Sequence, residues 1–197
     1  AVLRAVKEEH LEEQLMNRPM PGIMICSLLL MKEHMPEVYE KKACVLLPKD
    51  YIRFRLGGTM ETDETDGAGS LAFSVKDRRW CERLLKRLSI RTEIFPPVVK
   101  PYEITGRVTR EAAVETGLWE GTLLAAGGAD SAMQLTGNGV IEDGALAVNI
   151  GTASQIVAVM SKPVYDRQMR TQTLCHSVPG LWYQQCGSLN GGNALSW

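Results

Sequence analysis

The sequence predicts an α/β fold, in which helices and strands alternate along the chain and pack as layers. Two stretches support this prediction. A short apolar run at residues 123–126 has the composition of a buried strand, and after two glycines a helical pattern follows at residues 131–136. Farther along, residues 145–150 and 155–160 are apolar and flank a small polar turn, residues 151–154, which is typical of a β-hairpin.

The rest of the chain shows further helical and extended patterns. Helices are expected at residues 1–16, 23–35, 36–42, 48–58, 78–88 and 109–116. The first should be amphipathic and the second buried, while Pro48, Thr109 and Gly117 should mark helix ends. Strands are expected at residues 44–47, 172–178 and 181–186, and a proline-bearing connection at residues 91–106.

Charge and composition argue against several classes of protein. The chain has 22 basic and 23 acidic side chains, a balance that disfavours nucleic acid or an anionic membrane as the main partner. No apolar run in the sequence approaches membrane-spanning length. Its five cysteines show no C-x-x-C spacing, so we expect reduced thiols and a cytoplasmic protein.

Asp130 is the first candidate for chemistry, because it lies between the expected strand at residues 123–126 and the helix that follows. Aspartate is a favoured N-cap residue, so a purely structural role is one interpretation. The other is catalytic, since ligands of open α/β sheets bind beyond the strand ends, where this carboxylate would point. The residues alone leave both open.

Two glycine turns are candidates for phosphate binding. Gly151 and Thr152 begin the expected hairpin turn, where backbone N–H groups and a hydroxyl can donate to phosphate oxygens. Residues 190–192 form a second glycine turn before an expected helix at residues 193–197, and such a turn can hold a nucleotide. Each signal is weak by itself.

Several other patterns are interpreted as structural. Lys49, Arg53 and Arg55 are expected to form a solvated helix face. Asp63 and Asp66 lie in an acidic stretch that lacks the spacing of a Ca²⁺ loop, and we expect turn and cap residues near the cleft.

Cys175 and His176 could suggest thiol catalysis. Neighbours on a strand point to opposite faces, however, so His176 is a poor base for Cys175.

Six segments together resemble the FGGY carbohydrate kinases. They are LLPKDYIRFRLGG, TDETDGAGS, FPPVVKPYEITGRVT, GGADSAMQLTGNGVI, NIGTAS and NGGNALSW, and they cover most of the chain in that family's order. Within the family the likeness is greatest to members that phosphorylate ketopentoses such as xylulose. The resemblance implies an actin-like, ribonuclease-H-like two-domain sugar kinase fold, incomplete at both ends.

The expected domains are residues 1–142, the later part of the N-terminal kinase domain, and residues 143–197, the beginning of the C-terminal one. The family's Asp-x-Gly-Thr phosphate loop does not precede Ala1, and its adenosine-binding segment would follow Trp197. We therefore expect this fragment alone to be inactive.

The resemblance also assigns expected roles. Asp130 matches the catalytic base, Gly151 and Thr152 match a phosphate loop, and Gly192 matches a glycine of the nucleotide site. Ser196 falls where some members have a longer polar residue. The implied reaction is phosphorylation of a sugar hydroxyl by ATP. Mg²⁺ would bridge ATP oxygens, and no protein ligand for a metal is expected in this chain. The expected partners are the sugar and ATP, and a homodimer fits the family.

An alternative is a degenerate relative that binds sugar or nucleotide without turnover. The family has a Pro-Lys pair where this chain has Cys26 and Ser27, before Leu28, which favours that alternative. The aspartate at position 130 disfavours it.

Overall fold

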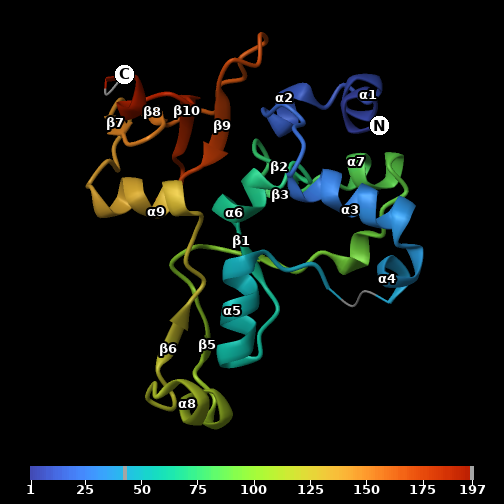
Figure 1. The fold of residues 1–197 in the computed structure, drawn as a ribbon, viewed down its shortest axis with the longest axis vertical. Coiled ribbons are helices and arrows are strands. Elements are labelled where there is room, and N and C mark those ends of the chain that lie inside the picture. The colour runs from blue at the N-terminus through green and yellow to red at the C-terminus, as the bar shows by residue number, and fades with distance from the viewer. Residues whose placement is uncertain (42–43, 196–197) are drawn as a thin grey trace.

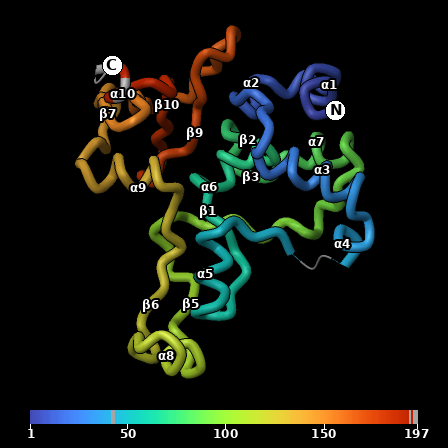
Figure 2. The backbone as a smooth tube through the Cα atoms, in the orientation of Figure 1, coloured from blue at the N-terminus to red at the C-terminus, as the bar shows by residue number. Residues whose placement is uncertain are grey.

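The computed structural model describes residues 1–41 and 44–195 (Figures 1 and 2). Three parts surround a central helix, α6 (Glu64–Gly69). They are a group of helices that begins at the N-terminus, a long projection ending in α8 (Arg110–Thr116), and a C-terminal antiparallel sheet (Figure 1). The mixed α/β composition agrees with the fold class that the sequence predicts.

The N-terminal helices pack around one apolar core. They are α1 (Val2–Glu8), α2 (Glu12–Leu15), α3 (Met24–His34), α4 (Pro36–Glu40) and α7 (Glu82–Arg87). The single helix expected at residues 1–16 is interrupted, because His10 takes a left-handed φ of 52° that an α-helix cannot continue through. The apolar face is still buried, with Leu11 at 0% and Leu15 at 1% exposure.

The expectation of a buried helix at residues 23–35 is wrong for much of α3. Ile25 and Leu28 are buried, but Leu30 is 60% exposed. Apolar composition alone does not show which face finds a partner, and this helix is covered on one side only.

Helix α5 (Pro48–Gly57) has the expected ends. Pro48 occupies the first turn, and Gly58 takes the left-handed conformation (φ +79°) that ends the helix. The strand expected at residues 44–47 is wrong. That segment joins no sheet, and its backbone contact is the N–H of Val45 donating to the carbonyl of Ile94 at 2.8 Å.

Short strands and one 3₁₀ turn frame α6. Strand β1 (Thr62–Asp63) pairs in parallel with β4 (Val98–Val99), and β2 (Phe73–Ser74) pairs antiparallel with β3 (Arg79–Trp80). The turn η1 (Thr92–Ile94) precedes β4. The helix expected at residues 78–88 therefore begins later, in α7, because its first residues belong to β3.

The projection is a β-ribbon with a helix at its tip (Figure 1). Strands β5 (Ile104–Arg107) and β6 (Leu123–Ala125) are antiparallel, and α8 lies between them in sequence. The hydroxyl of Thr109 accepts from the N–H of Ala112 at 3.2 Å, and Gly117 ends the helix with φ +76°. Both expected caps of α8 are confirmed.

Helix α9 (Asp130–Gly137) connects β6 to the C-terminal sheet. That sheet has the order β7–β8–β10–β9, and each neighbouring pair is antiparallel. Its strands are β7 (Leu146–Ile150), β8 (Ser154–Met160), β9 (Gln172–Cys175) and β10 (Trp182–Ser188). The expected hairpin and both later strands are confirmed. Helix α10 (Gly192–Leu195) follows, and the end of the helix expected at residues 193–197 lies outside the described residues, as does Ser196.

A second apolar core joins α6, α9 and the sheet. It contains Ala68, Phe73, Leu135, Val157 and Tyr183 among its buried members. Its residues come from both sides of the expected domain boundary at 142–143, which stays a prediction. Among the described residues, no helix is long and apolar enough to cross a membrane.

Candidate functional site

The loop between β6 and α9 presents Asp130. Ala129 is the N-cap of α9, so Asp130 is the first helical residue and does not occupy the cap position. Its Oδ1 instead accepts from the N–H of Ser131 at 2.6 Å. Asp130 is exposed. The carboxylate is therefore open to a ligand, and Asp130 lies one residue after the cap position, although it accepts from one backbone N–H of the first turn.

Asp130 lines a cavity of about 270 Å³, together with Thr65, Asp66, Ser131, Gln172 and Gln185. Burial and the nearby charge of Asp63 together raise the pKa of Asp66 to about 6, against the opposing effect of Lys49. The cavity thus has two carboxylates in its wall and several amide groups, a lining suited to a polyhydroxylated molecule.

The expected phosphate turn and the expected nucleotide glycine are in contact. The N–H of Gly192 donates to the carbonyl of Gly151 at 2.6 Å, and that of Gly191 donates to the carbonyl of Thr152 at 2.8 Å. A Cβ on Gly192 would lie 2.7 Å from the oxygen of Gly151, so a side chain there would push the two segments apart. Gly151, Thr152 and Gly192, which the sequence indicated in two separate segments, therefore lie together on one surface.

Gly151 of this surface lines a larger cavity of about 790 Å³, which is also lined by Gln134, Asn149 and Arg170. Gln172 and Gln185 line both the larger cavity and the smaller one that contains Asp130. The carboxylate and the glycine turn thus face neighbouring spaces that share a wall.

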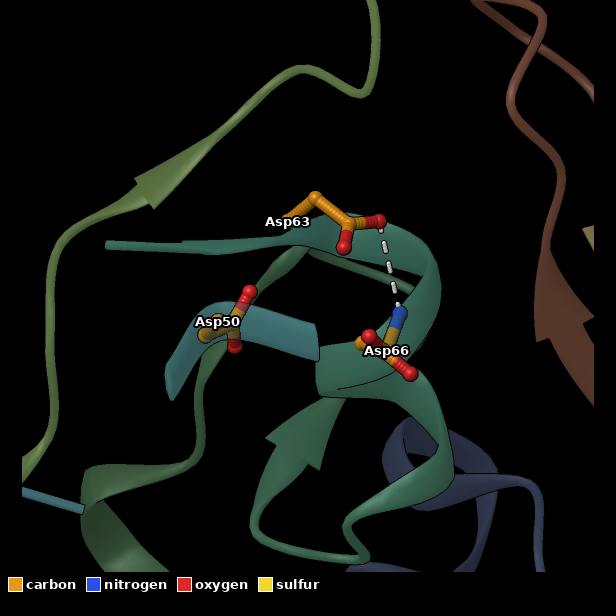
Figure 3. A group of neighbouring side chains, drawn as sticks. All are labelled: Asp50, Asp63 and Asp66. Carbon is orange, nitrogen blue, oxygen red and sulfur yellow. Dashed lines mark hydrogen bonds between the residues drawn. The ribbon is translucent and has the colours of Figure 1, made fainter. Parts of the chain in front are cut away.

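Sequence reasoning missed a cluster of three carboxylates, which Figure 3 shows. Oxygens of Asp50, Asp63 and Asp66 lie within 4.8 Å of one another. The Nζ of Lys49 is 2.6 Å from Asp50, 2.9 Å from Asp63 and 3.4 Å from Asp66. Burial lowers the pKa of Lys49, but the charges and hydrogen bonds of Asp63 and Asp50 outweigh burial and raise it. The ammonium group of Lys49 therefore occupies the position that a metal ion would take among the three carboxylates.

The same cluster corrects the expectation of a solvated basic face on α5. The side chain of Arg53 is 5% exposed and donates to Oδ1 of Asp50 at 3.2 Å, and that of Lys49 is 27% exposed. Only Arg55, at 58%, faces solvent as expected. Buried charges need partners, and here three elements supply them, which a pattern within one helix does not reveal.

Asp63 has the expected capping role. Its Oδ1 accepts from the N–H of Thr65 at 2.8 Å and from that of Asp66 at 3.4 Å, at the start of α6 (Figure 3). The adjacent lysine and aspartate at positions 49 and 50, together with the acidic stretch at residues 61–66, were the available signal for an ionic cluster.

The structure supports the conclusion against a Cys–His dyad for a different reason, since β9 ends at Cys175 and His176 lies just beyond the strand. Cys175 is buried, and burial raises the pKa of its thiol to about 12, so a thiolate is disfavoured. His176 uses both ring nitrogens elsewhere: Nε2 donates to the carbonyl of Val140 at 3.1 Å, and Nδ1 accepts from the N–H of Val178 at 3.0 Å. Neither group is poised for nucleophilic catalysis.

The chain belongs to the FGGY family of carbohydrate kinases, because residues 2–137 match the model of that family's N-terminal domain. It is similar to the xylulose kinase of Bacillus subtilis, with 32% identity over 189 residues that cover 96% of this chain and 38% of that protein.

Solved structures give the same result. A xyloylose kinase from Brucella ovis aligns with a TM-score of 0.90 and 26% identity, and a xylulose kinase from Rhodospirillum rubrum with 0.90 and 25%. Both alignments cover 100% of this chain and 40% of the other. The chain therefore has the fold of the sugar kinases, and it spans about two fifths of the length of these relatives.

Proposed function

We propose that this chain is part of an enzyme that transfers the γ-phosphoryl group of ATP to a hydroxyl of a sugar, namely a ketopentose such as xylulose. The observation that carries the proposal is the shared wall between the cavity of Asp130 and the cavity of Gly151. The names of the similar kinases support the choice of sugar. Sugar and ATP are then the partners, and the five free cysteines are in keeping with the cytoplasm.

In this proposal Asp130 is the catalytic base. Its carboxylate accepts the proton of the attacking sugar hydroxyl, while the hydroxyl oxygen bonds to the γ-phosphorus and the bond from that phosphorus to the ADP oxygen breaks. Thr152 donates hydrogen bonds to phosphate oxygens, Gly151, whose own N–H donates to the carbonyl of Ala153, lets a phosphate approach the turn, and Gly192 keeps the backbone beside them open. Gln172 and Gln185, which line both cavities, are placed to bind sugar hydroxyls.

Mg²⁺ would neutralise charge on the phosphates, and the described part of the chain offers it no evident site. Among the described residues, one cluster of three carboxylates is close enough to hold an ion, and Lys49 occupies its centre. The cluster therefore does not fit a resident Mg²⁺. The proposed chemistry of these residues is binding, orientation and proton transfer.

The test is a sugar-dependent assay of ADP release by the full-length enzyme that carries these residues. Xylulose, ribulose and glycerol are compared at matched concentrations, and calorimetry measures the binding of each. We expect turnover with a ketopentose and little with glycerol. Binding of xylulose without turnover would support the degenerate relative suggested by Cys26 and Ser27, and turnover with none of the sugars would contradict the proposal.

A further inference from the structure

Two side chains from outside the β6–α9 loop hold it in place just before Asp130. The N–H of Ala129 donates to Oγ1 of Thr65 at 2.7 Å, and Nζ of Lys49 donates to the carbonyl of Ala126 at 3.1 Å. Thr65 belongs to α6 and Lys49 to α5, so each bond crosses from another element to this loop. The resemblance to the kinase family did not assign a role to Thr65 or to Lys49.

The hydroxyl of Thr65 can serve the loop only as an acceptor. A threonine hydroxyl has one proton, and here it is donated to Oδ1 of Asp63 at 2.5 Å. Asp63 is 0% exposed, and its other oxygen lies 2.9 Å from Nζ of Lys49. The result is a continuous series of polar contacts. It runs from the ammonium of Lys49 through the carboxylate of Asp63 and the hydroxyl of Thr65 to the N–H of Ala129. Charged members strengthen such chains, and a low local dielectric strengthens them further.

The loop is shaped around this contact. A Cβ on Gly128 would come 2.7 Å from Oγ1 of Thr65 and 2.7 Å from Cε of Met133, which is closer than real side chains approach. Gly127 takes a φ of +71°, which favours glycine. Thr65 therefore reaches the backbone of the loop because position 128 has no side chain. The contact needs both the hydroxyl at position 65 and a glycine at position 128.

We propose that Thr65 is a positioning residue for phosphoryl transfer, because its hydroxyl fixes the peptide that directs the carboxylate of Asp130 into the smaller cavity. This inference rests on the proposed function. Ala129 is the N-cap, so α9 leaves its N–H without a helical partner and Thr65 supplies one. Asp130 is the next residue, and both it and Thr65 line the cavity of about 270 Å³.

Thr65 is expected to affect the rate because it orients the base, Asp130. A base contributes only when it lies within hydrogen-bond reach of the proton it accepts, and a displacement of about 1 Å can cost about 10²-fold in rate. Loss of the Thr65 hydroxyl frees the peptide before Asp130 and leaves the phosphate turn at Gly151 untouched. The defect should therefore appear in kcat, with little change in the KM for ATP.

The chain offers a matched control for this test. Thr62 is 1% exposed, lies in the strand that leads to α6, and its hydroxyl has no hydrogen-bond partner. Thr62→Val and Thr65→Val make the same chemical change at buried positions near Asp63. Only the second removes a bond to the loop, and Thr65→Ser restores the hydroxyl.

Kinetics of the full-length enzyme and hydrogen exchange at the Ala129 amide are measured for all three variants. In Thr65→Val we expect kcat to fall about 10- to 100-fold and the amide to exchange about tenfold faster. Thr65→Ser should stay within about threefold of wild type, because it retains the acceptor, and Thr62→Val should match wild type. If Thr65→Val does not fold, Thr65→Ala, which puts no methyl against Asp63, is assayed instead.

The proposal is overturned if Thr65→Val keeps the wild-type kcat, or if Thr62→Val loses as much activity as Thr65→Val. An unchanged exchange rate at Ala129 would also overturn it. If the wild-type enzyme phosphorylates no sugar, the proposed function fails by itself. The exchange measurement still decides whether Thr65 holds the loop, so the two failures are distinguishable.

Discussion

Gln134 and Asn149 exchange two side-chain hydrogen bonds. Nδ2 of Asn149 donates to Oε1 of Gln134 at 3.0 Å, and Nε2 of Gln134 donates to Oδ1 of Asn149 at 3.3 Å. Gln134 lies about one helical turn after Asp130 on α9, and Asn149 lies just before Gly151 on β7. The paired amides therefore tie the element that carries the proposed base to the strand that leads into the phosphate turn.

If this pair sets the spacing between base and turn, its two members should act as one unit. Gln134→Ala and Asn149→Ala should each lower kcat/KM for ATP about 5- to 10-fold, in line with about 1 kcal/mol for a hydrogen bond. The double variant should be no worse than either single one. Gln168→Ala, in an exposed loop, is the control. Additive losses in the double-mutant cycle would contradict the coupling.

Asp130 allows a direct test of its role. Asp130→Asn keeps the shape of the side chain and removes the base, so kcat should fall about 10²- to 10⁴-fold. The melting temperature should change little. Asp143→Asn, which alters an exposed aspartate away from both cavities, is the matched control.

The same position distinguishes catalysis from helix capping. A capping aspartate replaced by alanine would cost about 0.5–2 kcal/mol of stability. Because Asp130 follows the N-cap and accepts from a single backbone N–H of the first turn, that of Ser131, Asp130→Ala should cost no more than the lower end of that range. Normal turnover in the Asn variant, with a clear loss of stability in the Ala variant, would restore the capping interpretation.

Thr152 tests the proposed phosphate turn. Thr152→Val keeps the shape and removes a hydroxyl, and the loss of a hydrogen bond to a charged group costs about 1.5–3 kcal/mol. We expect kcat/KM for ATP to fall by the corresponding factor. Thr59→Val is a suitable control, because the Thr59 hydroxyl is buried without a hydrogen-bond partner. ATP kinetics equal to wild type would mean that the turn has only a structural role.

Local features of the fold could be predicted from the sequence because their causes are local. Pro48 and Gly58 bound α5, and Thr109 and Gly117 bound α8, through backbone preferences that belong to these residue types. The β7–β8 hairpin follows from alternating apolar runs around a turn of small residues. The break at His10 could not be predicted, because no glycine or proline marks it.

Features that depend on distant partners escaped prediction. Arg53 looks solvated within α5, yet Asp50 and the segment around Glu61 cover it in the fold. For the site, the patterns indicated Gly151 and Gly192 separately, but only the pairing of β10 with β8 brings them together. The sequence did not indicate Thr65, since its proposed role depends on a contact with Ala129, in a loop that is far away in sequence. The roles assigned to Asp130, Thr152 and the two glycines stay predictions.

Asp66 makes stability depend on pH in a defined direction. Burial and the charge of Asp63 raise its pKa from 3.8 to about 6 in the folded protein. The folded state therefore holds the proton more tightly than the unfolded chain does. This group's contribution to stability is fully present below about pH 3.8 and is lost as the pH rises through about 6. A difference of about two pKa units corresponds to about 3 kcal/mol.

Asp66→Asn removes this titration and keeps the size of the side chain. From pH 4 to pH 8, the variant should gain about 2–3 kcal/mol of unfolding free energy relative to wild type, because it has no charge to bury beside Asp63. Denaturant unfolding at several pH values measures this difference, with Asp143→Asn as the control at an exposed carboxylate. Lys49 still neutralises Asp50 and Asp63 in the variant, so folding should be retained. A difference between Asp66→Asn and wild type that stays constant across this range would show that Asp66 is already ionised at pH 4 in the folded protein, and that Lys49 outweighs burial.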